Sequence, residues 1–215
     1  MMIFQKLSWM TQMGIHTLCA EEPHSLMKKK PSTPPPSLTQ LDKSLITSKS
    51  SLSQTATNAL GGIGPIPAKL MCVLESPSAT EDRTGEALSG PEGDLLKKML
   101  AAIGLDTNTQ TYVTYLSPWR APGARVLTTL ETQEGLSLLQ KRMELVKPQV
   151  LLLFGVAVVK ALLNVPLGQA RNKPHDYKGI PTFATFAPSF LLKNTAYKKQ
   201  AWADLQAFQK ALKDS

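Results

Sequence analysis

The sequence predicts an α/β fold, a three-layer α/β/α sandwich around a central, mostly parallel sheet of four strands. Segments typical of strands alternate with segments typical of helices between residues 68 and 213, which favours a parallel sheet with helices on both faces. The strongest strand pattern is the continuous apolar run VLLLF at 150–154, as expected for a central strand buried on both faces. The expected helices instead place apolar residues on one face, as Trp202, Leu205, Phe208 and Leu212 do near the end of the chain.

The alternation defines eight elements in order. We expect strands at 70–74, 111–116, 150–154 and 181–186, and helices at 94–103, 133–146, 156–163 and 195–213. Pro148 ends the second helix, because proline cannot continue a helix interior. The chain shows no internal repeat.

Length and charge limit the broad class of protein. The 215 residues are enough for one domain of ordinary size and a tail, and 42% hydrophobic residues can form a sizeable core. The net charge of +8 suits a polyanion such as nucleic acid, although proteins that bind none also have such an excess.

Two regions precede the domain predicted at 68–215. Residues 1–21 have apolar side chains at helical spacing, which predicts an amphipathic helix on the domain's own surface or on a partner that the sequence does not identify. Residues 22–67 are rich in Pro, Ser and Lys, which predicts a flexible or polyproline-like linker. The basic run at 28–30 is a solvated charge run or a contact to a phosphate backbone.

Cysteine usage and hydropathy indicate the compartment. Cys19 and Cys72 do not have the spacing of a disulfide or metal framework. No apolar run approaches the roughly 18–20 residues of a membrane span, and the first twenty residues lack a secretory signal's apolar core and cleavage site. We therefore expect a cytoplasmic protein without a membrane partner.

The stretch from Lys69 to Gly93 has the composition of a ligand site. The apolar strand at 70–74 is followed by a tight polar turn, an acidic and basic cluster at 81–83 and a glycine-rich segment before a helix. Open α/β sheets bind ligands beyond the carboxyl ends of their strands, at turns of this kind. A plain strand-to-helix turn with surface charges has the same pattern.

This stretch resembles the first motif of family 4 uracil-DNA glycosylases. In that family the strand ends in Gly-Glu-Ala-Pro-Gly and continues through Glu-Asp, Arg and several glycines to a leucine-rich helix. The shared positions are Glu75, Pro77, Glu81, Asp82, Arg83, Gly85, Gly90, Gly93, Leu95 and Leu96. Segments 111–125, 146–163 and 179–206 resemble the later family motifs in order, and the first helix resembles a leader found before some bacterial members.

The resemblance implies a uracil-DNA glycosylase-like fold, DNA as the partner, and hydrolysis of the N-glycosidic bond of uracil in base-excision repair. Glu75 and Asp82 are then the residues expected to orient water. The expected DNA contacts, to single-stranded or uracil-containing DNA, are Arg83, Arg120, Arg125, Ser189 and Lys193. The arginines are otherwise solvated surface residues, and Leu191 and Leu192 are either a wedge into DNA or ordinary core residues.

The base pocket departs from the family. The positions that the resemblance assigns to it are Ser76, Leu88, Tyr115 and Ala187. Leu88 replaces a phenylalanine that stacks on uracil, Tyr115 an asparagine that reads its edge, and Ala187 a histidine that donates to it. Excision of uracil is therefore expected to be weak or lost. The pocket that receives the flipped nucleotide needs groups that stack on the base and read its edge, and the departing base needs a donor that stabilises its negative charge. Two functions stay open, a divergent glycosylase with another base preference and a silent nucleic-acid-binding or scaffold protein.

The family's iron–sulfur cluster has no ligands here. Its four cysteines align with Thr47, Ser50, Trp119 and Gly135, none of which offers a thiolate. We therefore expect no cluster, no other metal site and no cofactor, with Trp119 filling the space by apolar packing.

Overall fold

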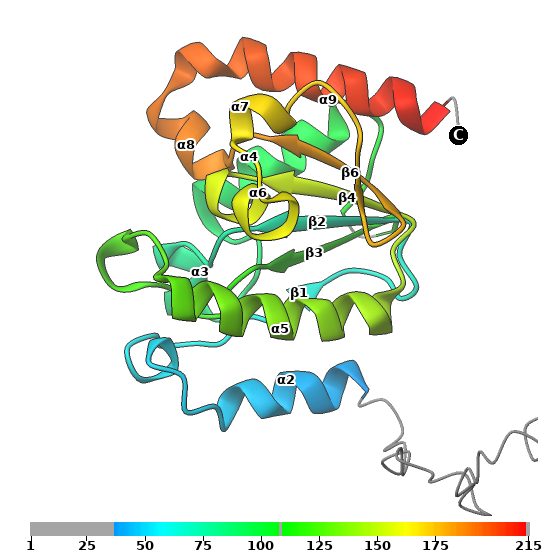
Figure 1. The fold of residues 1–215 in the computed structure, drawn as a ribbon. Helices are drawn as coiled ribbons and strands as arrows, with labels where there is room; N and C mark the ends of the chain where they lie inside the picture. The colour runs from blue at the N-terminus through cyan, green and yellow to red at the C-terminus, as the bar shows by residue number, and fades with distance from the viewer. Residues whose placement is uncertain (1–36, 108, 214–215) are drawn as a thin grey trace, which may run out of the picture. The chain divides into compact units, whose positions relative to one another are not determined.

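The computed structural model describes residues 37–107 and 109–213, so the helix predicted at 1–21 and residues 22–36 lie outside the described residues. A single sheet of six strands has the order β1-β3-β2-β4-β6-β5. The strands are β1 (Gly62–Ile63), β2 (Leu70–Leu74), β3 (Thr111–Tyr115), β4 (Val150–Phe154), β5 (His175–Tyr177) and β6 (Ile180–Thr185). The central strands β3, β2, β4 and β6 are parallel, which confirms the predicted α/β class (Figure 1).

Two short antiparallel edge strands extend the four that were predicted. β1 pairs with β3 through Gly62 and Ile63, and β5 forms a hairpin with β6 around Lys178 and Gly179. Lys178 and Gly179 both have positive φ values of 54° and 84°, as hairpin turns of two residues require. Because both edge strands are only two or three residues long, the alternation that reveals a strand is too brief to detect in the sequence.

Helices cover both faces of the sheet. The described helices are α2 (Leu38–Ile46), α3 (Ala79–Thr84), α4 (Gly90–Ala101), α5 (Thr129–Val146), α6 (Val156–Leu163), α7 (Leu167–Ala170), α8 (Pro188–Lys193) and α9 (Lys198–Lys213), with 3₁₀ turns η1 (Leu52–Gln54), η2 (Pro122–Ala124) and η3 (Thr195–Tyr197). Alternate residues of β2 point to opposite faces. Met71 and Val73 pack against α5, α6 and α7, whereas Leu70 and Cys72 pack against α4, α8 and α9.

The layers match the predicted sandwich, and several element bounds do as well. β2, β4 and α6 have the predicted bounds. The helix predicted from residue 94 begins at Gly90, because Pro91 fits the first turn of a helix. Within residues 37–107 and 109–213, no helix combines the length and apolar character that a membrane span requires.

Residues 37–67, about two thirds of the predicted linker, are folded, so the linker prediction is wrong for them. α2 begins at Ser37, which forms a reciprocal capping box with Gln40. Leu41 and Leu45 are buried on one face of this helix. Its Asp42 accepts a bond of 2.5 Å from Arg142, a buried residue of α5, and this pair holds α2 against the domain.

Candidate functional site

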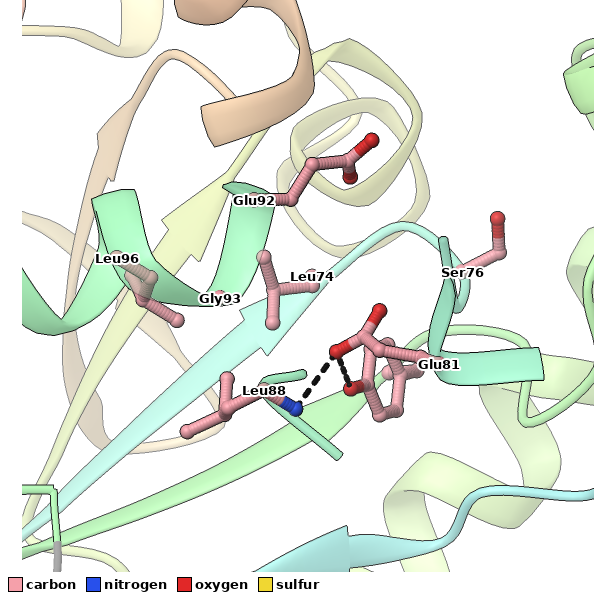
Figure 2. Close-up of a pocket in the computed structure, with 8 residues that line it drawn as sticks. Leu74, Ser76, Glu81, Leu88, Glu92, Gly93 and Leu96 are labelled. Carbon is pink, nitrogen blue, oxygen red and sulfur yellow. Dashed lines mark hydrogen bonds between the residues drawn. The ribbon is translucent and has the colours of Figure 1, made fainter. Parts of the chain in front are cut away.

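A small depression lies beyond the carboxyl ends of β2 and β3, where an open α/β sheet places its ligand. Its residues come from the end of β2, the loop after it, α3, the N-terminal half of α4 and the end of β3. They are Leu74, Ser76, Glu81, Leu88, Glu92, Gly93, Leu96 and Tyr115 (Figure 2). The depression is small, about 220 Å³ with the space that is open to solvent included.

Glu81 is the buried acid at the centre of this site. Its Oε2 accepts a bond of 2.7 Å from the Ser78 amide, as in a capping box at the start of α3. Its Oε1 accepts bonds from the Leu88 amide at 2.7 Å and from the Tyr115 hydroxyl at 2.5 Å, as Figure 2 shows. Both oxygens of Glu81 are therefore occupied by the protein itself.

Tyr115 closes the depression at the end of β3. Its side chain is only 3% exposed, and its hydroxyl donates to Glu81. Burial, and then the negative charge and hydrogen bond of Glu81, raise the pKa of the Tyr115 hydroxyl well above its ordinary value. The hydroxyl therefore remains a protonated donor, and the ring stays where the resemblance expects a small polar residue that reads a base.

Leu88 is held in place by its backbone. Its φ of 62° lies in the left-handed region, which is unusual for a residue other than glycine. Its amide donates to Glu81, and its carbonyl accepts a bond of 3.0 Å from Lys97. A side chain at Gly93 would collide with the Leu88 carbonyl, so glycine lets α4 pass close to this loop.

Glu92 is a second acid in the wall, on the first turn of α4. Partial burial raises the pKa of Glu92, and the charge of Glu81 raises it further, while Lys193 and Arg120 oppose the shift. The Glu92 side chain makes no hydrogen bond to any other residue that the structure describes. Its carboxyl group is thus subject to the opposing charges of Glu81 on one hand and of Lys193 and Arg120 on the other.

Glu75 and Ala187, which the resemblance assigns to catalysis and to the pocket, meet at a different place. Glu75 Oε1 accepts a bond of 2.8 Å from the Ala157 amide at the N-terminus of α6. A side chain at Gly155 would collide with the Glu75 carboxyl and crowd the Ala187 methyl, and Gly155 has a φ of 102°. Neither Glu75 nor Ala187 is among the residues that line the depression.

Asp82, the other predicted catalytic residue, instead fastens the loop before β1. Its Oδ1 accepts bonds of 2.9 and 3.0 Å from the amides of Thr57 and Asn58, and its carbonyl accepts one from the Asn58 side chain. Of the predicted pocket residues, the structure brings together Ser76, Leu88 and Tyr115 only.

Four of the five predicted DNA contacts are available on segments that follow strand ends. Arg83 is exposed at the end of α3, after β2, and Arg120 is partly exposed in the loop after β3. Ser189 is partly exposed and Lys193 exposed on α8, after β6. Because β2, β3 and β6 are parallel, all four residues follow the same edge of the sheet as the depression.

Arg125, the fifth predicted contact, has a structural partner. Its guanidinium binds both oxygens of Glu131 at 2.7 and 2.8 Å. The hydrogen bonds from Arg125, helped by the Thr128 amide, lower the pKa of the Glu131 carboxyl to about 2. Since Glu131 and Thr128 form the capping box of α5, Arg125 stabilises the start of that helix.

The leucine pair of the last motif is divided between core and surface. Leu191 is buried against β6 and α9 at 1% exposure, which makes it a core residue. Leu192 is 39% exposed and stays available for a contact outside the domain.

The positions aligned with the cluster cysteines do not fit an iron–sulfur cluster. Trp119 is buried among apolar residues, which are Leu45, Leu52 and Ala121. Ser50 donates to Glu134 at 2.8 Å, and a side chain at position 135 would collide with the Leu116 carbonyl. The surroundings of these positions are therefore those of ordinary packing and hydrogen bonding, and none of the aligned residues offers a thiolate.

The sequence predicts no role for the two acids of the depression, Glu81 and Glu92, although Glu81 is one of the positions shared with the family motif. The spacing of Ser78 and Glu81 is that of a capping box, which predicts a helix start and was a detectable signal. Nothing in the sequence indicates that the same carboxylate also accepts from Tyr115, which is 34 residues away.

The mostly parallel sheet, its order and the depression at the strand ends define an α/β protein with a candidate ligand site at the carboxyl edge. Residues 62–206, more than half of the chain, match the family described as "Uracil DNA glycosylase superfamily". The chain belongs to the uracil-DNA glycosylase superfamily, as the first motif predicted.

Curated proteins give the same placement. The chain is 26% identical to a protein named type-4 uracil-DNA glycosylase from Archaeoglobus fulgidus over 168 residues, 74% of this chain and 84% of that protein. It is 26% identical to the protein of the same name from Pyrobaculum aerophilum over 171 residues, 74% of this chain and 86% of that one. It is also 27% identical to a DNA polymerase of Bacillus phage SP01, over 67% of this chain and 16% of the polymerase.

Proposed function

We propose that this chain is a DNA-binding protein of base-excision-repair ancestry, in which the parent reaction, hydrolysis of the N-glycosidic bond of uracil, is weak or lost. The observation that supports the proposal most is the hydrogen bond of 2.5 Å between the Tyr115 hydroxyl and Glu81 inside the base pocket. A flipped base needs an open pocket with free polar groups to read its edge. Here a buried ring and an occupied carboxylate take that place.

The charges of the pocket also oppose excision. A departing uracil develops negative charge, which glycosylases stabilise with hydrogen-bond donors. Glu81 and Glu92 instead offer two acidic groups, and Ala187 has no donor in its side chain. Losing one such donor typically costs on the order of 100- to 1,000-fold in rate.

DNA binding depends on other residues. Arg83, Arg120 and Lys193 form no ion pair among residues 37–107 and 109–213, and they follow the strand ends beside the pocket. Positive side chains at this edge suit the phosphates of a nucleic acid strand. The relatives named as uracil-DNA glycosylases support DNA as the partner.

A glycosylase for a different base is the second candidate. Ser76 and Glu92 line the depression without a hydrogen bond to another described residue, so they are free to contact a base that offers N–H donors. A scaffold protein without any excision would leave these two groups unused.

Uracil release and DNA binding by the unmodified protein test the proposal together. We expect little or no uracil release from single- and double-stranded DNA, alongside binding to uracil-free DNA that weakens as salt increases. Rapid uracil release that Glu75→Gln abolishes would refute the loss of excision. Release of another base from a panel of modified strands would favour the second candidate.

The proposed DNA contacts at the strand ends can be tested separately from excision. Arg120→Ala combined with Lys193→Ala should weaken DNA binding at low salt and lower the slope of log affinity against log salt by roughly 1.5, as expected for two phosphate contacts. Lys141→Ala combined with Lys210→Ala is the matched control, because it removes the same charge from exposed positions in the later parts of α5 and α9. Equal weakening in both pairs would mean that net charge, and not this edge, determines binding.

A further inference from the structure

An ordered group of aromatic rings, which the proposed function does not use, lies between β6 and α9. Phe186 and Phe190 stack with centroids 5.3 Å apart, and Tyr197 meets both rings edge-on at 5.3 and 5.1 Å. The Arg171 guanidinium lies 4.1 Å from the centroid of Phe186. Arg171 is itself fixed by a bond of 2.7 Å to Asp204, which anchors its contact with the Phe186 ring.

The outer ring of this group is open to solvent. Tyr197 is 39% exposed, and Phe190 is partly exposed beside it. Both rings lie on the segment through α8, η3 and the start of α9, which follows β6 on the side of the molecule where α3 also lies (Figure 1). The segment borders the pocket, because α8 packs against α4, the helix that carries Glu92.

The charged side chains of the same segment are all positive. Residues 188–203 include Lys193, Lys198 and Lys199 and contain no aspartate or glutamate. All three lysines are exposed, and none is in an ion pair within the described part of the chain. An exposed aromatic ring among unpaired lysines is the combination that binds single-stranded nucleic acid, because lysines follow the phosphates and rings stack on bases.

We infer that Tyr197, supported by Phe190 and Phe186 and flanked by Lys193, Lys198 and Lys199, is a stacking platform for unpaired bases of single-stranded DNA. The inference rests on the proposed DNA binding and specifies the form of DNA at one surface. A duplex keeps its bases stacked on each other, so it offers the lysines phosphates but offers Tyr197 no free base face. The platform therefore favours a single strand that leaves the pocket along α8 and the start of α9.

Binding to three labelled probes tests the platform. The probes are a short oligothymidylate, a strand of equal length built of abasic units, and the matching duplex, followed by fluorescence anisotropy. We expect the protein to prefer oligothymidylate to the abasic strand, since the two differ in bases and not in phosphate charge. Tyr197→Ala should weaken oligothymidylate binding at least about 5-fold, the lower bound for losing one stacked base, and leave abasic binding unchanged.

Two variants keep the test specific. Tyr197→Phe preserves the ring and should retain the preference for oligothymidylate, whereas Ile46→Ala removes an exposed apolar side chain of α2 and should change nothing. If the protein binds all three probes equally and Tyr197→Ala has no effect, the platform is refuted while DNA binding stands. If it binds none of them, the proposed DNA binding fails and the platform fails with it.

Discussion

The triple variant Leu88→Phe, Tyr115→Asn, Ala187→His should release uracil from DNA at least ten times faster than the unmodified protein. Tyr115→Asn removes the buried ring and one of the two hydrogen bonds that Glu81 Oε1 accepts. Leu88→Phe provides an aromatic face for a base. Ala187→His adds a donor near Glu75, because both residues lie against Gly155, and one such donor is typically worth on the order of 100- to 1,000-fold.

The three changes should act as a unit. Each single variant should gain little in the rate of uracil release. An open pocket without a donor cannot stabilise the leaving base, and a donor beside a closed pocket has no base to contact. Adding Glu92→Ala should raise the rate again, since it removes an acid from the wall where negative charge develops. Single-turnover release of uracil from a labelled strand measures these rates.

A control within the triple variant identifies the residue that acts on water. Glu75→Gln in that background should abolish the gain if Glu75 orients the water. An unchanged triple-variant rate would contradict the view that these three positions limit excision, and it would mean that the loss extends to other positions, such as Asp82, which fastens Thr57 and Asn58.

Elements with a strong and regular residue pattern could be predicted from the sequence, whereas elements with a weak pattern could not. β4 was predictable because five consecutive apolar residues, all but the first fully buried, leave only a central strand as an interpretation. α2 was not, since its nine residues follow a Pro-rich run and its two buried leucines are too few to outweigh that composition. Its capping box, Ser37 with Gln40, was the local signal that could have identified it.

Site residues were less predictable than elements, because a motif specifies residue type and not the partner of each side chain. Arg125 has the family's position and charge, yet its guanidinium is bound to Glu131. Asp82 and Glu81 are adjacent in the sequence but point to different segments, one to the loop at 57–58 and the other to Tyr115. Such pairings depend on contacts between distant segments, which no local pattern encodes.

Trp119 packs segments that precede the sheet against the loop after β3. The residue is 3% exposed and lies with Leu45 of α2, Leu52 of η1 and Ala121 in one apolar cluster. Leu45 and Leu52 precede the sheet, whereas Trp119 and Ala121 belong to the loop after β3. Trp119 therefore contributes to holding residues 45–52 against the domain.

Trp119→Ala should lower the free energy of unfolding by about 3–5 kcal/mol, the usual cost of replacing a buried large aromatic residue with alanine. The apolar cluster around it is small, so its remaining side chains have little material to fill the cavity. Urea denaturation followed by circular dichroism measures the loss, and Trp202→Ala is the matched control, because that side chain is 39% exposed and should cost far less. A Trp119→Ala protein as stable as the Trp202→Ala protein would show that Trp119 does not bear the connection between α2 and the sheet. A large loss for Trp119→Ala alone would show that the packing of this side chain supports the connection.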